Sequence, residues 1–327
     1  MILLTGGAGM IGSIIAWHLN TILNEDQFVI VDNIQNKEQE KNFSKRHFIE
    51  YVDKKDLQKF LKDKKNISSI LHMGAISATT ETNFNNLLEC NIRYSQMLWH
   101  WCVKNKIPYI YASSAATYGG GEFDYIDDEK KLDQLCPLNA YGYSKHFFDR
   151  WVQNQINSNQ PTPPQWCGLK FFNVYGPNDY HKNRMASVVF HAFNQFRNEG
   201  EIRLFKSEHP DYKDGLQLRD FIYVKDAVDC VMFFLKNNNI SGLFNIGTGH
   251  AQSFKELAES VILNSKGNLS SIRYINMPND LQGKYQYYTQ ANLDKIRAIG
   301  LNLKFKSLNK GVTDYVQNYL LQQDRYA

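Results

Sequence analysis

The sequence has few cysteines, and their arrangement suits neither a disulfide framework nor a zinc site. The five cysteines are odd in number, widely spaced and without a Cys-x-x-Cys pair. They are Cys90, Cys102, Cys136, Cys167 and Cys230. This pattern favours reduced thiols or small buried side chains. We therefore expect a cytoplasmic protein without structural disulfides or a bound metal.

Long apolar runs and concentrated charge are also missing. No hydrophobic run reaches the ~18 residues that a membrane-spanning helix requires, and the chain begins with "MILLTGGAG" rather than a basic leader. The 37 basic and 33 acidic residues give a net charge of only +4, and the lysines are spread along the chain. We expect neither a membrane nor a nucleic acid as a partner.

The first half of the sequence instead alternates short apolar runs with helical segments. The expected strands lie at 1–5, 28–32, 68–74 and 107–114, and the expected helices at 12–23 and 87–105. Such an order is typical of βαβ units. It predicts an α/β protein with a doubly wound, Rossmann-type parallel sheet.

The second half mixes strand and helix signals without a clean linker. Strands are expected at 167–176, 202–205, 219–224, 242–248 and 271–277, helices at 185–198, 225–236, 254–265 and 309–321, and loops at 35–47, 119–135 and 154–165. We interpret residues 1–170 as the Rossmann domain. Residues 171–327 would mainly form a smaller, interleaved α/β substrate lobe, with a segment around 215–250 returning to the first domain.

A glycine-rich turn follows the first expected strand. "TGGAGMIG" places Gly6, Gly9 and Gly12 before an apolar helix, where they allow a tight turn and let a pyrophosphate approach backbone N–H groups. Asp32 ends the second expected strand about 20 residues later, where a carboxylate can accept hydrogen bonds from an adenosine ribose. Together they predict a nicotinamide dinucleotide site, although Asp32 could merely cap the strand end.

The choice between NAD and NADP stays open on these residues. The Asp32 carboxylate repels a 2′-phosphate, whereas Lys37, Lys41 and Lys54 follow and could neutralise one. Each of these lysines could equally belong to a solvated loop. "HMGAIS" at 72–77 places small residues at another strand end, where the cofactor's adenosine or ribose would lie.

Serine, tyrosine and lysine form a pattern that suits hydride-transfer chemistry. Ser114 ends a strand, and Tyr141 and Lys145 stand four residues apart in "YGYSK", on one helical face. The Lys145 ammonium can lower the phenol pKa of Tyr141 from ~10 toward neutrality, so that the phenolate accepts a proton from a hydroxyl group. Lys145 would also bind the nicotinamide ribose, and Ser114 the reacting oxygen. An exposed helical pair is the alternative interpretation.

These motifs together resemble the extended short-chain dehydrogenase/reductase superfamily, whose members act on nucleotide sugars. More narrowly, the ADP-L-glycero-D-manno-heptose 6-epimerases are similar in "PLNAYGYSKHFFD", "FFNVYGPNDYHKNRMASVVFH", "RDFIYVKDAVD", "SGLFNIGTGHAQSF" and "DLQGKYQYYTQANL". The resemblance implies an isomerase with bound NADP, or NAD, that inverts C6 of ADP-D-glycero-β-D-manno-heptose by transient oxidation. It further implies heptose supply for lipopolysaccharide and a homo-oligomer, a pentamer.

The resemblance also implies a second acid/base. Inverting a carbon while the nicotinamide stays fixed requires proton exchange on both faces of the substrate, and Lys182 in "YHKNRMAS" matches the family's lysine for this role. Burial could lower its pKa from ~10.4 far enough for it to act as a base. Alternatively, Lys182 only binds the diphosphate or faces water.

Further site residues follow from the resemblance, position by position. Implied cofactor ligands are Gly6, Gly9, Met10, Ile11, Gly12, Asp32, Asn33, Lys54, Met73, Gly74, Ala75, Ile76, Ser77, Asn91, Tyr141, Lys145 and Val174. Implied substrate ligands are Ser114, Asn173, Arg184, His191, Phe205, Lys206, Ser207, Glu208, Arg219 and Tyr285. Arg219 and His191 suit a diphosphate, although His191 could be an ordinary helix residue.

The chain departs from the family pattern at three places. Lys206 replaces an acid before a longer loop to Arg219. Arg184 stands where a small hydroxyl residue is usual, and the family's phosphate-sensing lysine falls near Gln39. These departures concern the adenosine contacts and the NADP preference more than the reaction.

Other functions of the same fold stay open. A 4-epimerase or 4,6-dehydratase of nucleotide sugars would use the same Tyr141–Lys145 pair, although Ala115 and Ala116 occupy positions where dehydratases carry an acidic pair. A net dehydrogenase would release reduced cofactor, whereas an epimerase would not. A non-catalytic nicotinamide-binding sensor is a remote alternative, and the intact Ser114, Tyr141 and Lys145 argue against it.

Overall fold

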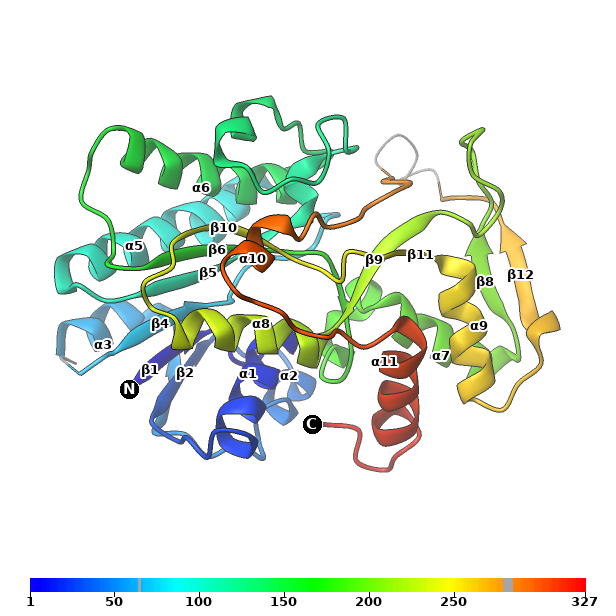
Figure 1. The fold of residues 1–327 in the computed structure, drawn as a ribbon. Coiled ribbons are helices and arrows are strands. Elements are labelled where there is room, and N and C mark those ends of the chain that lie inside the picture. Colours follow the sequence, from blue (N-terminus) through cyan, green and yellow to red (C-terminus); the bar gives the residue numbers. More distant parts are fainter. Residues whose placement is uncertain (64–65, 279–284) are drawn as a thin grey trace.

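A seven-stranded parallel sheet forms the centre of the computed structural model, which describes residues 1–63, 66–278 and 285–327 (Figure 1). Its strands are β1 (Ile2–Thr5), β2 (Phe28–Asp32), β3 (Glu50–Asp53), β4 (Ser69–His72), β5 (Tyr109–Ser114), β6 (Trp166–Phe171) and β10 (Gly242–Ile246). They lie in the order β10-β6-β5-β4-β1-β2-β3, and every neighbouring pair is parallel. The predicted Rossmann-type fold is confirmed.

Helices cover both faces of this sheet, which explains why its strands are continuous apolar runs. In Figure 1, α5 (Tyr94–Asn105) and α6 (Ala140–Asn157) lie on one face, and α1 (Met10–Thr21) and α8 (Val224–Lys236) on the other. Leu3, Leu4 and Ile30 are fully buried between the layers. Burying such side chains contributes about 1.5–3 kcal/mol each. The core of the protein therefore lies on both sides of the central strands.

A smaller lobe lies beyond the carboxyl ends of the strands, on the right of Figure 1. It contains the three-stranded sheet β11 (Ala251–Ser253), β9 (Leu218–Tyr223) and β7 (Asn173–Tyr175), and the parallel pair β12 (Ile272–Ile275) and β8 (Ile202–Phe205). The helices α7 (Val188–Glu199), α9 (Phe254–Asn264) and α11 (Leu308–Tyr315) pack beside them. The chain returns to the large sheet through α8 and β10. The proposed division at residue 170 stays a prediction.

Several short elements were not expected. They are β3, β11, α3 (Leu57–Asp63), α4 (Phe84–Leu87) and α10 (Asp294–Ala298). Three loop predictions were partly wrong, because 35–47 contains α2 (Lys37–Lys41), 119–135 contains a 3₁₀ segment at Glu129–Gln134, and α6 continues to Asn157. α2 is polar throughout and begins where the Asn36 side chain accepts a hydrogen bond from the Gln39 N–H. Capping therefore forms this helix where apolar periodicity gives no signal.

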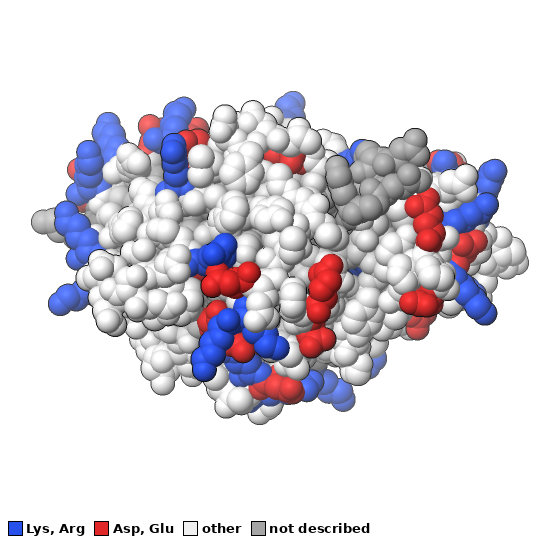
Figure 2. All heavy atoms as spheres, turned by 90° about the horizontal axis from the view of Figure 1, so that it is seen from above, with Lys and Arg blue, Asp and Glu red and all other residues white. Residues whose placement is uncertain are grey.

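Charged side chains of both signs are interspersed on the face shown in Figure 2. Within the described residues, no helix combines the length and apolar character needed to cross a membrane. The same residues contain no group of three or more His, Cys, Asp or Glu side chains that could hold a metal ion. All five cysteines are free thiols.

The strand order positions a crevice at the carboxyl ends of β1 and β4. The chain passes from β1 to β2 on one side of β1, while β4 lies on the other side, so the connections diverge between these neighbours. Ligands of doubly wound sheets bind at such a point. Here the Met73 N–H donates to the Thr5 carbonyl at 3.0 Å, which holds the loop after β4 against the glycine turn.

Asp220 on β9 joins the smaller lobe to the large sheet. Its Oδ1 accepts hydrogen bonds from the N–H and hydroxyl of Thr248 at 2.8 and 2.7 Å. Its Oδ2 accepts from the N–H groups of Gly249 and Ala291 at 2.9 and 3.0 Å. The Asp220 side chain is fully buried, so water could not take its place as the acceptor for these donors.

We predict that Asp220→Asn lowers the free energy of unfolding by about 2–4 kcal/mol, because an amide NH2 group would face backbone donors in a buried site. Urea denaturation measures the change. Asp128→Asn is the matched control: Asp128 caps a 3₁₀ segment by accepting from the Lys130 N–H, and asparagine caps about as well, so its effect should stay below about 0.5 kcal/mol. Equal losses in the two variants would contradict this account of Asp220.

Candidate active site

A cleft of ≈ 720 Å³ lies at the carboxyl ends of the central strands. Most of the residues expected to bind cofactor line it: Gly6, Gly9, Met10, Ile11, Gly12, Asp32, Asn33, Lys54, Met73, Gly74, Ala75, Ile76, Ser77, Tyr141, Lys145 and Val174. Ser114, Asn173 and Lys182 line it as well. The fold thus gathers residues from Thr5 to Leu257 around one cavity.

The glycine turn is closely packed and fits an anion. Gly6 has a φ of +71°, and a Cβ atom there would lie 2.4 Å from the Gly74 nitrogen. A Cβ atom at Gly12 would lie 2.1 Å from the Gly6 carbonyl oxygen. α1 begins after Gly9, and no side chain of the described residues caps it. Its first-turn N–H groups lack helical acceptors, so this end of the cleft suits a pyrophosphate.

Asp32 both braces the glycine turn and lines the cleft. Its Oδ2 accepts a hydrogen bond from the Ala8 N–H at 2.8 Å, and its Oδ1 accepts from the Asn33 N–H at 2.7 Å. Burial raises the carboxyl pKa, while these hydrogen bonds and the Lys54 charge act in the opposite direction. Asp32 therefore caps the glycine turn and also lies on the cleft wall, where its expected contact with a ribose stays a prediction.

Of the three lysines after β2 considered as phosphate ligands, Lys54 lines the cleft, whereas Lys37 and Lys41 do not. Lys54 donates a hydrogen bond to the Cys90 sulfur at 3.1 Å, and its Nζ lies 4.8 Å from the Tyr94 ring centroid. Lys41 instead pairs with Glu38 at 3.5 Å, away from the cavity. The expectation that Lys37 and Lys41 could neutralise a cofactor phosphate finds no support in their positions.

Asn91 is not among the residues that line the cleft, and its expected contact with the cofactor stays a prediction. Its side-chain oxygen accepts from the Ile76 N–H, and its amide donates to the Ile76 carbonyl and the Ser144 hydroxyl, all at 2.9 Å. Asn91 is buried between the loop after β4 and α6. It therefore braces the loop after β4 against α6.

Ser114, Tyr141 and Lys145 meet where β5 ends beside α6. Lys145 is buried, and its Nζ donates to the Ala112 carbonyl at 2.8 Å. Burial lowers the Lys145 pKa to about 8, although the Asp149 carboxylate acts against this shift. Burial likewise raises the Tyr141 pKa, opposed by a hydrogen bond with Ser114. The expected downward shift of the phenol pKa is wrong, because the loss of hydration outweighs the favourable contacts.

Lys182 lies in the 3₁₀ segment Tyr180–Met185, on the part of the cleft formed by the smaller lobe. Its N–H donates to the Asp179 carbonyl at 3.1 Å, and the following Asn183 adopts a φ of +49°, which turns the chain. Burial lowers the Lys182 pKa, and the Asp179 charge opposes the change. The direction expected for this pKa is confirmed.

Some expected substrate residues gather in a second cluster, outside the residues that line the cleft. The Arg219 guanidinium lies 4.9 Å from the Tyr285 ring centroid and 5.5 Å from that of Phe254. Phe205 contacts Tyr285 edge to face, with ring centroids 6.3 Å apart. Arg219 is only 5% exposed, and burial lowers its pKa. The cluster offers aromatic faces around one cation.

The other expected substrate residues are not brought into the cleft. Arg184 is exposed, and the carbonyl oxygen of Arg184 lies 3.2 Å from the His191 Nε2. Lys206, Ser207 and Glu208 begin the segment after β8, in which the Ser207 N–H donates to Asp214. The motif "DLQGKYQYYTQANL" starts at 280, so its first part lies outside the described residues.

Sequence reasoning missed several residues of the cavity wall, namely Gln35, Cys90, Tyr94 and His181. Cys90 and Tyr94 are four residues apart in the segment leading into α5, and this spacing could have assigned them to one face. Gln35 precedes the unexpected helix α2. Gln39, where the chain departs from the family pattern, lies within that helix. Burial lowers the His181 pKa to about 4, so this imidazole is neutral near pH 7.

Known proteins are similar to this chain in sequence and in architecture. The sequence model of the NAD dependent epimerase/dehydratase family matches residues 2–247. ADP-L-glycero-D-manno-heptose-6-epimerases from Fusobacterium nucleatum and Nitratidesulfovibrio vulgaris are 49% and 44% identical, each over 100% of both chains. The crystal structure of the Helicobacter pylori ADP-L-glycero-D-manno-heptose-6-epimerase superposes with a TM-score of 0.80 at 27% identity, covering 97% of this chain and 95% of that one.

Family match, full-length identity and fold agree with the nicotinamide cleft described above. The chain therefore belongs to the NAD dependent epimerase/dehydratase family, among its ADP-L-glycero-D-manno-heptose-6-epimerases.

Proposed function

We propose that the chain is an isomerase that inverts C6 of ADP-D-glycero-β-D-manno-heptose to give the ADP-L-glycero-β-D-manno epimer. The observation that carries this proposal is the presence of two side chains able to exchange protons, Tyr141 and Lys182, on the wall of one cleft. The names of the full-length relatives support the choice of substrate. The product would supply heptose for lipopolysaccharide.

The cleft fits a nicotinamide dinucleotide. The first turn of α1 would hold the pyrophosphate, Asp32 the adenosine ribose, and Lys145 the nicotinamide ribose. A nicotinamide held there would supply reversible hydride transfer at the sugar carbon. The residues of the chain then have to orient the sugar and move the hydroxyl proton.

Tyr141 and Ser114 would act on one face of the reacting carbon. Ser114 donates a hydrogen bond to the sugar oxygen, and the Tyr141 phenol exchanges a proton with it. The raised pKa of Tyr141 makes the phenol a proton donor when the carbonyl is reduced. Lys182 would serve the opposite face, and its lowered pKa increases the fraction of neutral amine able to accept a proton.

The Arg219 cluster would bind the ADP part of the substrate. A buried guanidinium can bind a diphosphate through two parallel hydrogen bonds, and the rings of Phe205 and Tyr285 offer surfaces for the adenine. Lys206, Ser207, Glu208, Arg184 and His191 would contribute at its rim. The homo-oligomer and the cytoplasmic location stay predictions.

We further propose that the cofactor is NAD rather than the NADP implied by the resemblance. Beyond Asp32, the cleft wall presents the neutral amides of Gln35 and Gln39. Lys54 is engaged with Cys90 and the Tyr94 ring, and Asp32 repels a 2′-phosphate. The wall therefore suits a free ribose hydroxyl.

The function is tested by incubating the purified protein with ADP-D-glycero-β-D-manno-heptose and following the C6 configuration by NMR. We expect inversion without accumulation of reduced cofactor in solution. Tyr141→Phe and Lys182→Met should each slow inversion by about 10²-fold or more, since each removes a proton carrier. Lys41→Met, a lysine outside the cleft, should leave the rate unchanged. Conversion of a 4-hydroxyl epimer instead, or a wild-type rate for Lys182→Met, would contradict the proposal.

The cofactor preference is tested by the affinities for NAD and NADP, measured by calorimetry. We expect tighter binding of NAD, and Gln39→Lys should increase NADP affinity about tenfold or more by supplying a charge-assisted hydrogen bond to the phosphate. Lys37→Gln, a change in the same helix but outside the cleft, is the control and should have no effect. Tighter binding of NADP by the wild type, lost in Lys54→Gln, would identify Lys54 as a phosphate ligand and contradict the proposal.

A further inference from the structure

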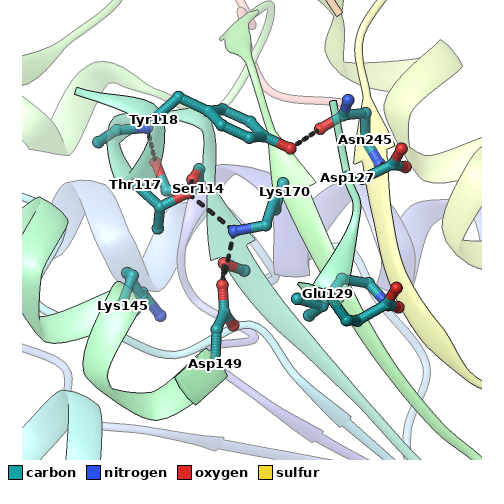
Figure 3. A network of polar contacts seen from close by, with 12 residues as sticks. Ser114, Thr117, Tyr118, Asp127, Glu129, Lys145, Asp149, Lys170 and Asn245 are labelled. Carbon is teal, nitrogen blue, oxygen red and sulfur yellow. Dashed lines mark hydrogen bonds and ion pairs between the residues drawn. The ribbon is translucent and has the colours of Figure 1, made fainter. Parts of the chain in front are cut away.

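A fully buried ion pair lies directly behind the catalytic residues (Figure 3). The Lys170 Nζ on β6 is 2.7 Å from the Asp149 Oδ2 on α6, and the two side chains are 1% and 0% exposed. Neither residue lines the cleft. Burying a charge pair between a helix and an otherwise apolar strand contributes little net stability compared with apolar side chains of similar size. Stability alone therefore gives no reason for this pair.

Asp149 connects the catalytic helix to the catalytic strand. It lies one helical turn after Lys145 on α6. Its Oδ2 also accepts a hydrogen bond from the Ser113 hydroxyl at 2.6 Å, and its Oδ1 accepts from the Tyr111 hydroxyl at 3.1 Å. Ser113 directly precedes Ser114. The carboxylate thus holds the end of β5 and the Lys145 turn of α6 in one arrangement.

Lys170 extends the same network to the segment that follows Ser114. Its Nζ donates to the Thr117 hydroxyl at 2.8 Å, and Thr117 in turn donates to the Ser114 carbonyl at 2.8 Å. The Tyr118 ring centroid lies 5.1 Å from the same Nζ. Figure 3 shows Lys170 between Thr117 and Asp149. The buried Lys170 ammonium therefore contacts the Thr117 hydroxyl, the Asp149 carboxylate and the Tyr118 ring in place of water.

We propose that the Asp149–Lys170 pair positions Ser114 and Lys145 for the reaction and sets the charge balance behind them. This inference rests on the proposed function, because it assigns the two residues a part in that reaction. They are positioning residues, since neither reaches the cavity. Asp149 fixes the helix that carries Lys145, and Lys170 fixes the turn that carries Ser114.

The electrostatic effect of the pair supports the proposal. The Asp149 charge favours the protonated forms of both Lys145 and Tyr141. It opposes the effect of burial on the Lys145 pKa and adds to the effect of burial on the Tyr141 pKa. The charged and titratable groups around the pair come from four other elements besides its own. Tyr111 on β5, Tyr118 after β5, and Tyr141, Lys145 and His146 on α6 interact with the pair itself. One step further out, His72 on β4 interacts with Lys145, Asp127 and Glu129 before α6 interact with Tyr118, and Arg150 interacts with His146. Burial lowers the pKa of both histidines, to about 4 for His146, so both are neutral near pH 7.

The test follows the titration of Lys145 by NMR in protein labelled with ε-¹⁵N lysine, with Lys145→Met to assign the signal. The Lys145 pKa of about 8 should fall in Asp149→Asn, because Asp149 is the charge that favours the protonated amine. It should rise in Lys170→Met, because removing the Lys170 ammonium leaves the Asp149 carboxylate without its paired cation. Each shift should be about one pH unit. A merely structural role would not move the pKa in opposite directions. The double variant Asp149→Asn/Lys170→Met removes both charges, should return the pKa toward the wild-type value, and covers the case that a single variant does not fold.

Kinetics provide a second readout. Both single variants should lower kcat about tenfold with little change in KM, because the substrate ligands are untouched, and the alkaline limb of the pH profile should move with the Lys145 pKa. Lys170→Arg keeps the charge and should restore most of kcat. Asp226→Asn is the matched control, since it breaks the pair with Lys306 at 3.0 Å outside the cleft and should leave the Lys145 titration unchanged.

An unchanged Lys145 pKa in both single variants, or shifts in the same direction, would overturn the inference. Lack of heptose conversion by the wild-type protein would overturn the proposed function alone, because the titration requires no substrate.

Discussion

Loss of hydration at the carboxyl edge of a parallel sheet is the constraint on which the rest of this structure depends. Helices cover both faces of the sheet, so an ionisable group at the strand ends has to be neutral, paired or directed into the cleft. Burial is the largest influence on the pKa of Tyr141, Lys145 and Lys182 alike. The same constraint forces Lys170 and Asp149 to pair. Burial lowers the pKa of both lysines, which is the direction that the proposed proton exchange requires.

The backbone provides the second half of the site. The positive φ of Gly6 and the close approach of Gly12 to its carbonyl bring the start of α1 against the loop after β4. Asp32 and Asn91 then fix the two sides of that crevice with hydrogen bonds to backbone groups. A rigid cofactor cleft follows. The smaller lobe adds Lys182 to the cleft wall and carries the Arg219 cluster outside the residues that line the cleft. Their parts in the inversion of a sugar carbon belong to the proposal.

The structural features that depend on local sequence were predictable. The glycine turn, the main strands and the Tyr141–Lys145 spacing are encoded within a few consecutive residues each, and the structure has them where they were expected. Lys182 was assigned only through resemblance to a family, since its own surroundings in the sequence indicate a loop. The short polar helix α2 has no apolar period, so the sequence did not show that Gln39 lines the cleft while Lys41 of the same helix does not.

The parts that depend on contacts between distant segments were not predictable. The direction of the Tyr141 pKa shift follows from how deeply α6 packs, which no spacing reveals. Asn91 turned out to brace a loop because Ser144, 53 residues further on, lies beside it. The pairing of Asp149 with Lys170 joins a helix and a strand, and only the single lysine in an apolar strand hinted that a partner was needed.

In the proposed reaction, C6 is inverted by removal of a hydride and its return to the opposite face of the same carbon. The most direct measurement uses ADP-D-glycero-β-D-manno-heptose with deuterium at C6 and follows that position in the product by NMR and mass spectrometry in ordinary water. The account predicts that the deuterium is retained at the inverted carbon. Replacement of the deuterium by solvent hydrogen would mean that C6 is deprotonated instead, and would contradict the account.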